Sequence, residues 1–110
     1  MKKLDHIIEF YGETCPHCVA LRPIVEGIEK DRGVEIQKLE VWNNAENRKL
    51  MLQYEDMIGE ACGGFAAVPA LVNTKTKQAL CGAHDAKEIE ALIDGADCKD
   101  NICKPHSKLS

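Results

Sequence analysis

Along the chain, apolar residues form short continuous runs in some stretches and recur with the period of a helix in others. The continuous runs, typical of strands, cover residues 6–11, 34–41, 70–73 and 78–82. Helical spacing predicts helices over residues 14–33, 43–62 and 85–95. The resulting order, β-α-β-α-β-β-α, predicts an α/β fold with a mixed central sheet of about four strands and helices on both faces.

Residue types that cap helices stand at the expected helix starts. Thr14, Asn43 and Asp85 are the predicted N-caps, and a glutamate follows the last two by three residues, as in a capping box. Pro23 falls inside the first helix and is expected to kink it. The apolar stripe between Leu50 and Ala61 has no break, which predicts one continuous second helix.

Length and charge restrict the kind of protein. A chain of 110 residues suffices for one domain with a core, which we place at residues 1–95, followed by an irregular tail at residues 96–110. The formal net charge of −4 argues against a nucleic-acid partner. The pattern contains neither a membrane span nor a secretory leader, so we expect a monomeric cytoplasmic protein without a membrane partner. An exported protein whose leader has been removed would show the same pattern.

Cys15 and Cys18 give the most specific chemical signal, because they follow a strand and open a helix with the spacing C-x-x-C. Residues three apart lie on one face of a helix, and its first turn favours an anion such as a thiolate. A zinc site would need a second C-x-x-C, and a haem attachment would need a histidine in place of Val19. The pattern favours a redox-active dithiol that needs no cofactor and no metal.

The two thiols are expected to have different roles. Cys15, at the tip of the helix, is the expected exposed nucleophile that forms a mixed disulfide with a protein substrate. Cys18, one turn further, is expected to be shielded and to resolve that intermediate. His17 can place an imidazolium beside the Cys15 thiolate and favour its ionisation, which stabilises the reduced pair.

These motifs make the chain resemble the thioredoxin family over residues 4–95. The segment FYGETC at 10–15 stands where the family has its strand, its aromatic residue and the approach to its nucleophile. Pro23 has the spacing of the family's kinking proline, Val68-Pro69 resembles its cis-proline, and Gly82 resembles the glycine that ends its last strand. The resemblance implies a thioredoxin fold.

The resemblance also implies how substrates and electrons reach the site. It implies a cis bond before Pro69 and a docking groove in which Tyr11, Pro16 and the backbone of Val68 contact an extended substrate segment. Electrons would come from a reductase or from a small thiol. The spacer containing His17 departs from reducing thioredoxins and is instead that of periplasmic thiol oxidases of the same fold.

Glu9 is a second candidate for chemistry. It lies within the first strand, where an ionisable group is rarely buried without a partner or a function. Lys38 interrupts the next strand similarly, and the resemblance implies that the two are a buried acid and its lysine partner. We expect Glu9 to have a raised pKa and to accept the proton of Cys18.

Four further cysteines need an interpretation. Cys62 precedes two glycines and is a candidate third redox thiol, whereas Cys81 ends a strand and reads as a small buried hydrophobe. Cys98 and Cys103 lie in the tail and are a possible second pair, either a local disulfide or relay thiols. With His106 they could also contribute three ligands to a zinc site.

The resulting hypothesis is a thiol–disulfide oxidoreductase that acts on protein disulfides, as a reductant in the cytoplasm, where the poise of the compartment sets the direction. Three alternatives stay open at this point. They are a metal- or cluster-binding module using Cys15, Cys18, Cys62 and the tail cysteines, a glutaredoxin-like reductase that uses glutathione, and an interaction protein with vestigial thiols.

Overall fold

The computed structural model describes residues 2–64, 66–82 and 84–95, which form four strands and four helices. The elements in chain order are β1 (Lys2–Tyr11), α1 (Pro16–Arg32), β2 (Val34–Glu40), α2 (Ala45–Leu52), α3 (Glu55–Cys62), β3 (Ala70–Asn73), β4 (Gln78–Cys81) and α4 (Ala86–Asp94). The predicted α/β class is confirmed. The tail pair Cys98–Cys103 and His106 lie outside the described residues.

The four strands form one open mixed sheet in the order β2-β1-β3-β4. β1 pairs in parallel with β2 and antiparallel with β3, and β3 and β4 form the predicted hairpin. β1 begins earlier than predicted, at Lys2, and its register with β2 shifts between Leu4 and Ile8. The mixed four-stranded sheet is therefore confirmed, with β1 as a central strand.

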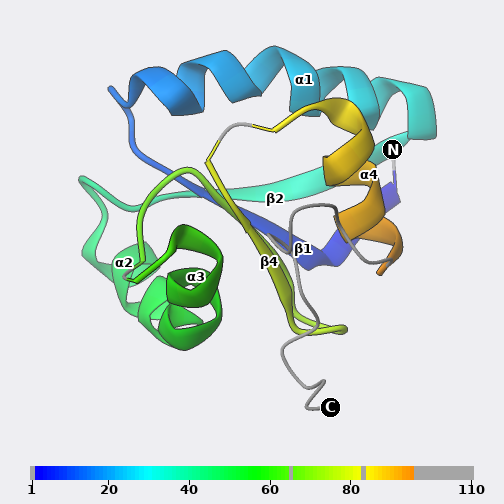
Figure 1. Cartoon of the computed structure of the whole chain (residues 1–110). Coiled ribbons are helices and arrows are strands. Elements are labelled where there is room, and N and C mark those ends of the chain that lie inside the picture. The colour runs from blue at the N-terminus through cyan, green and yellow to red at the C-terminus, as the bar shows by residue number, and fades with distance from the viewer. Residues whose placement is uncertain (1, 65, 83, 96–110) are drawn as a thin grey trace.

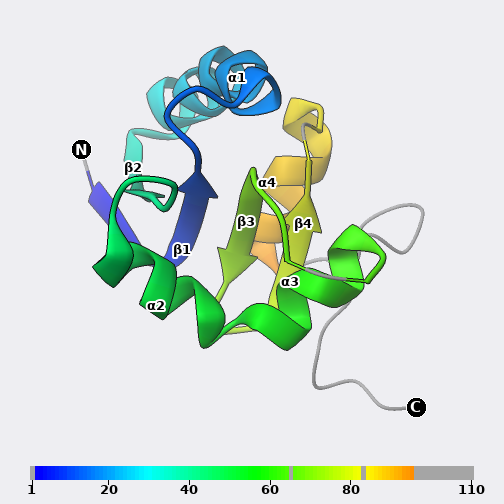
Figure 2. The ribbon, with the colours of Figure 1, turned by 90° about the vertical axis from the view of Figure 1, so that its left-hand side faces the viewer.

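Helices cover both faces of the sheet, as Figures 1 and 2 show. α1 and α4 pack on one face around Ile7 of β1, and α2 and α3 pack on the other around Ile8 and Phe10. Successive side chains of a strand point to opposite faces, so a central strand is apolar on both sides. By the same alternation Glu9 points to the face of Ile7, toward α1.

The helix starts differ from the prediction in two places. Cys15, not Thr14, caps α1, and its side chain accepts the N–H of Cys18. Asn44, not Asn43, caps α2, because the side-chain oxygen of Asn44 accepts the N–H of Asn47 at 3.0 Å. The predicted Asp85 cap of α4 is confirmed.

The predicted second helix is two helices, α2 and α3. The N–H groups of Gln53 and Tyr54 bond back three residues, to Leu50 and Met51, which tightens and ends α2. The Tyr54 carbonyl then accepts the N–H of Ile58 as α3 begins. The break lets both short helices turn apolar residues toward the same face of the sheet.

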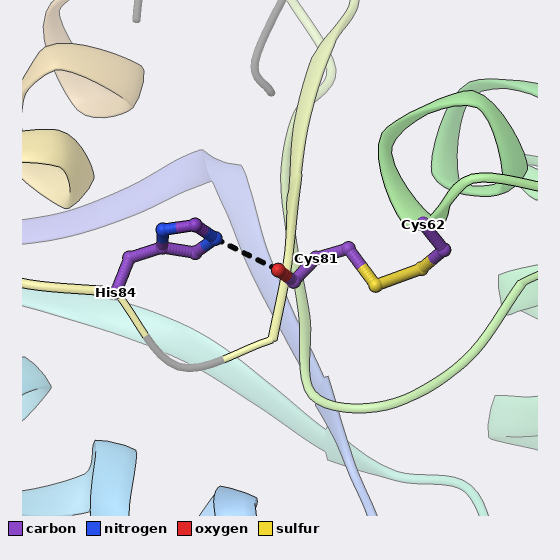
Figure 3. Close-up of a disulfide and its surroundings, with 3 residues drawn as sticks. All are labelled: Cys62, Cys81 and His84. Carbon is purple, nitrogen blue, oxygen red and sulfur yellow. Dashed lines mark hydrogen bonds between the residues drawn. A yellow bond between two sulfur atoms is a disulfide. The ribbon is translucent and has the colours of Figure 1, made fainter. Parts of the chain in front are cut away.

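A disulfide joins Cys62, at the end of α3, to Cys81, at the end of β4 (Figure 3). The predictions that Cys62 is a free redox thiol and that Cys81 is only a small hydrophobe are therefore wrong. α3 packs beside β4 and brings the two Cα atoms to 5.0 Å, within the usual range for a disulfide. On the other side of the strand, a ring nitrogen of His84 bonds to the Cys81 carbonyl at 2.8 Å.

This disulfide closes a loop across 19 positions of sequence, which limits the unfolded chain. Replacing both Cys62 and Cys81 by alanine should lower the free energy of unfolding by about 3 kcal/mol, measured by urea denaturation. A reductant should lower the free energy of unfolding of a Cys15→Ser/Cys18→Ser control, in which Cys62 and Cys81 remain, by the same amount as the double alanine substitution. Unchanged stability in both experiments would contradict a structural role for the bond.

Candidate functional site

The turn from β1 into α1 brings the two thiols together. The Cys15 N–H donates to the Gly12 carbonyl at 3.1 Å, which closes the turn, and the Cys15 carbonyl accepts the Val19 N–H at 3.0 Å as the helix begins. The Cys15 sulfur accepts the N–H of Cys18 at 3.2 Å. Both cysteines are free thiols. The predicted dithiol is thus assembled at the positive end of a 17-residue helix.

The prediction that Cys15 is exposed is wrong. Only 4% of its surface is accessible, against 1% for Cys18, so both thiols are buried. The N-cap conformation of Cys15 is the physical reason, because it turns the sulfur back over the first turn toward the Cys18 N–H. Pro16 and His17, the two residues between the thiols, are exposed.

Cys18 is shielded, as predicted. Its sulfur accepts the Gly12 N–H at 3.5 Å. Desolvation is the main reason that the pKa of the Cys18 thiol is raised to about 12, and the hydrogen bond with Cys15 and the charge of Glu9 raise it further. A thiol in this state needs a base before it can attack a disulfide, because the thiolate is the nucleophile.

Glu9 is a buried carboxyl without a full set of partners. It is 4% exposed, and its Oε1 has no hydrogen-bond partner among the described residues. Desolvation raises the pKa of Glu9 to about 7, against the smaller opposing effects of the Lys38 and Arg22 charges. The predicted raised pKa is confirmed, and a group of this kind is suited to accept a proton near neutral pH.

Lys38 lies directly across from Glu9 in the pairing of β1 with β2, as the resemblance implied, but it forms its salt bridge with another residue. Its ammonium lies 2.6 Å from Oε2 of Glu29 on α1. The same Glu29 oxygen accepts the Ile36 N–H at 2.8 Å, which fixes the carboxylate against β2. Sequence reasoning missed Glu29, although it lies four residues after Val25 on the buried stripe of α1.

β1 ends and β3 begins at the same end of the sheet, as Figure 2 shows. The Val68–Pro69 bond is cis, as the resemblance implied. Phe10 pairs with Ala70, so the antiparallel register places Pro69 next to Tyr11. Pro69 is buried, and Val68 and Tyr11 are half-buried. The register thus brings Pro69 to the strand end that leads into the Cys15 turn.

The loop after β2 holds the thiol turn in place, which sequence reasoning did not foresee. The Glu40 carboxylate accepts the N–H groups of Glu13 at 2.9 Å, Trp42 at 3.1 Å and Asn43 at 2.8 Å. Desolvation would raise the pKa of Glu40, but these three donors together lower it. The Trp42 ring covers Gly12 so closely that an added Cβ would lie 2.8 Å from its Cε3 atom. Gly12 is therefore required by a close approach.

The sequence matches no known protein family and no curated protein. Among residues 2–64, 66–82 and 84–95, no three histidine, cysteine or acidic side chains are grouped to hold a metal ion. The Cys62–Cys81 bond removes Cys62 from the ligands that the metal-binding alternative required. Within the described part of the chain, no helix has the length and apolar composition needed to cross a membrane.

Gly12→Ala should disturb the site through Trp42. The new methyl group would overlap the indole ring, so we expect a loss of about 1–3 kcal/mol in stability and a changed emission from the single tryptophan. Gly27→Ala is the matched control, because nothing lies within 4 Å of its added Cβ and alanine favours a helix interior. Equal effects of the two substitutions would contradict the close approach of Trp42 to Gly12.

Glu9 should make the folding stability depend on pH. Its folded-state pKa of about 7 lies above the ordinary value of 4.5, so the folded chain holds the proton more tightly than the unfolded chain. The stability that the folded chain gains by holding the Glu9 proton is fully present below about pH 4.5 and is lost as the pH rises to about 7. The loss is roughly 3 kcal/mol.

Denaturation of wild type and Glu9→Gln across this range tests the assignment. The substitution should remove the loss, so that Glu9→Gln gains stability over wild type as the pH rises. Glu26→Gln, which removes an exposed carboxyl from α1, is the control and should keep the wild-type profile. A Glu9→Gln profile parallel to that of wild type would show that Glu9 is not the titrating group.

Proposed function

We propose that this chain is a thiol–disulfide oxidoreductase of the thioredoxin type that exchanges disulfides with protein substrates through Cys15 and Cys18. The observation that carries the proposal is the pair of free thiols in the first turn of α1, joined by a 3.2 Å hydrogen bond between the Cys15 sulfur and the Cys18 N–H. A buried carboxyl with a pKa of about 7 acts electrostatically on the second thiol.

In the first step, the Cys15 thiolate attacks one sulfur of the substrate disulfide. A bond forms between Cys15 and that sulfur, the substrate disulfide breaks, and the other substrate sulfur leaves as a thiolate. The Cys18 N–H, which donates to the Cys15 sulfur at 3.2 Å in the first turn of α1, holds that sulfur in place for the attack. Only 4% of the Cys15 surface is accessible, so the substrate disulfide must approach the sulfur beside the exposed residues Pro16 and His17.

In the second step, Cys18 resolves the mixed disulfide. Glu9 accepts the thiol proton, the Cys18 sulfur attacks Cys15, and the second substrate sulfur leaves as a thiolate. The substrate gains two electrons and the Cys15–Cys18 pair loses two. Glu9 is suited to this role because the raised pKa of Cys18 leaves the thiol protonated without a base.

The fold supports the same proposal. A sheet with the order β2-β1-β3-β4, a cis proline at the start of β3 and a dithiol at the start of α1 fit a thioredoxin fold. We propose that Val68, Pro69 and Tyr11 line the groove for an extended substrate segment, which the register of β1 and β3 brings to one sheet edge.

In a reducing cytoplasm the pair would run as a reductant, supplied by a reductase or a small thiol, and the chain would act as a monomer. The Cys62–Cys81 disulfide favours an oxidising compartment instead, because stable disulfides are typical of oxidising surroundings. The direction depends on the reduction potential of the Cys15–Cys18 pair relative to the redox poise of the compartment.

Trapping the intermediate tests the proposal. With Cys98 and Cys103 changed to serine throughout, Cys18→Ser should accumulate a mixed disulfide between Cys15 and a protein substrate, detected by mass spectrometry. Cys15→Ser should give no adduct and lose disulfide reduction to the background rate. Wild-type activity in Cys15→Ser would refute the assignment of the nucleophile.

The same assay examines Glu9. With Cys18 present, Glu9→Gln should slow release of the substrate from Cys15 by about a hundredfold near neutral pH, whereas formation of the adduct should change little. Glu26→Gln serves as the control, since it also removes one carboxyl but from the exposed side of α1. Unchanged release in Glu9→Gln would refute the proton transfer and leave the dithiol chemistry intact.

A further inference from the structure

One ammonium group has two buried carboxyls within its reach. We propose that Glu29 is a positioning residue: by binding the Lys38 ammonium, it keeps that group from forming a direct ion pair with Glu9 and leaves the Glu9 carboxyl free to accept a proton. The inference rests on the proposed function of Glu9, but the geometry that carries it is independent of any activity.

The register of the sheet makes Lys38 the natural partner of Glu9. The two residues are directly paired across β1 and β2, which run parallel. Paired residues of parallel strands point to the same face, here the face covered by α1. An ammonium on a flexible four-carbon stem could therefore turn toward Glu9, and in this structure it does not.

Glu29 offers the better site because its carboxylate is already fixed. The Ile36 N–H holds Oε2 at 2.8 Å, and the Lys38 ammonium reaches the same oxygen at 2.6 Å and the Ile36 carbonyl at 3.3 Å. Glu29 is 8% exposed, so this is a largely desolvated carboxylate whose loss would leave Lys38 without its acidic partner. In contrast, Oε1 of Glu9 has no hydrogen-bond partner in the described part of the chain.

The other groups around Glu9 do not provide a substitute. The Arg22 charge on α1 acts on Glu9 less than Lys38 does, and Arg22 itself is exposed. Cys18, also on α1, is uncharged in its thiol form. On the β3 side the paired residue is Leu71, which is apolar. Among the charged groups that act on Glu9, Lys38 thus has the largest effect. The position of its ammonium therefore controls how readily the Glu9 carboxylate accepts a proton.

Glu29→Gln should release Lys38 while the amide oxygen still accepts the Ile36 N–H. We expect the ammonium to turn to Glu9 and to lower the midpoint of the Glu9 titration by about 1–2 pH units. The midpoint is measured from the carboxyl ¹³C shift of Glu9 in the reduced protein. Glu26→Gln, the exposed control on the same helix, should leave the midpoint unchanged.

Removing the Glu29 charge would itself lower the midpoint, so Lys38→Met is added to separate the two effects. If Glu29 holds Lys38 away, Lys38→Met raises the Glu9 midpoint more in the Glu29→Gln background than in wild type. Equal shifts in the two backgrounds would overturn the positioning role. Glu29→Asp, which retracts the carboxylate by one methylene, should give a smaller downward shift and replaces Glu29→Gln if that variant fails to fold.

The pH profile of substrate release from Cys15 is the second readout. Its rise with pH should move to lower pH in Glu29→Gln together with the Glu9 midpoint. A moved midpoint with an unmoved profile would refute the proton transfer by Glu9 and would uphold the placement of Lys38 by Glu29. An unmoved midpoint would refute the placement whatever the activity, so the two proposals fail separately.

Discussion

The burial of one carboxyl on the central strand is the constraint on which the rest of this structure depends. The residues before and after Glu9 on β1, Ile8 and Phe10, belong to the core on one face of the sheet. Glu9 itself lies on the other face, with Ile7. Burying an acid there costs free energy unless it is paired or protonated. Within residues 2–64, 66–82 and 84–95, Oε1 of Glu9 has no hydrogen-bond partner, and the pKa of Glu9 is raised to about 7. A structural role alone would not require this arrangement, which is typical of a functional group.

The thiol turn is held mainly from outside its own helix. Glu40 binds backbone N–H groups both of the turn, at Glu13, and of its own loop, at Trp42 and Asn43. Trp42 closes over Gly12, whose N–H in turn contacts the Cys18 sulfur. The position of Cys18 therefore depends on the end of β2 as well as on α1. Such support from a rigid neighbour is what fixes a reactive group.

The sequence predicted what local pattern determines. The strands, the start of α4 at Asp85 and the buried position of Glu9 follow from period, capping chemistry and the composition of neighbouring residues. It did not predict features that depend on which elements pack together. The Cys62–Cys81 bond needs α3 beside β4, and the Lys38–Glu29 pair needs α1 across β2. The spacing of residues along the chain does not indicate either of these packing arrangements.

The disulfide and the buried Glu9 carboxylate make contributions to folding stability that are similar in magnitude and opposite in sign. Ionised Glu9 costs roughly 3 kcal/mol, from its displaced pKa, and closing the loop between Cys62 and Cys81 contributes about as much. A small domain has only about 5–15 kcal/mol of stability in total. A chain of 110 residues that buries a carboxyl in a central strand thus benefits from the stabilising covalent bond between Cys62 and Cys81. The disulfide joins α3 to β4 on the sheet face opposite α1, so it adds stability without a covalent link to the helix that carries Cys15 and Cys18.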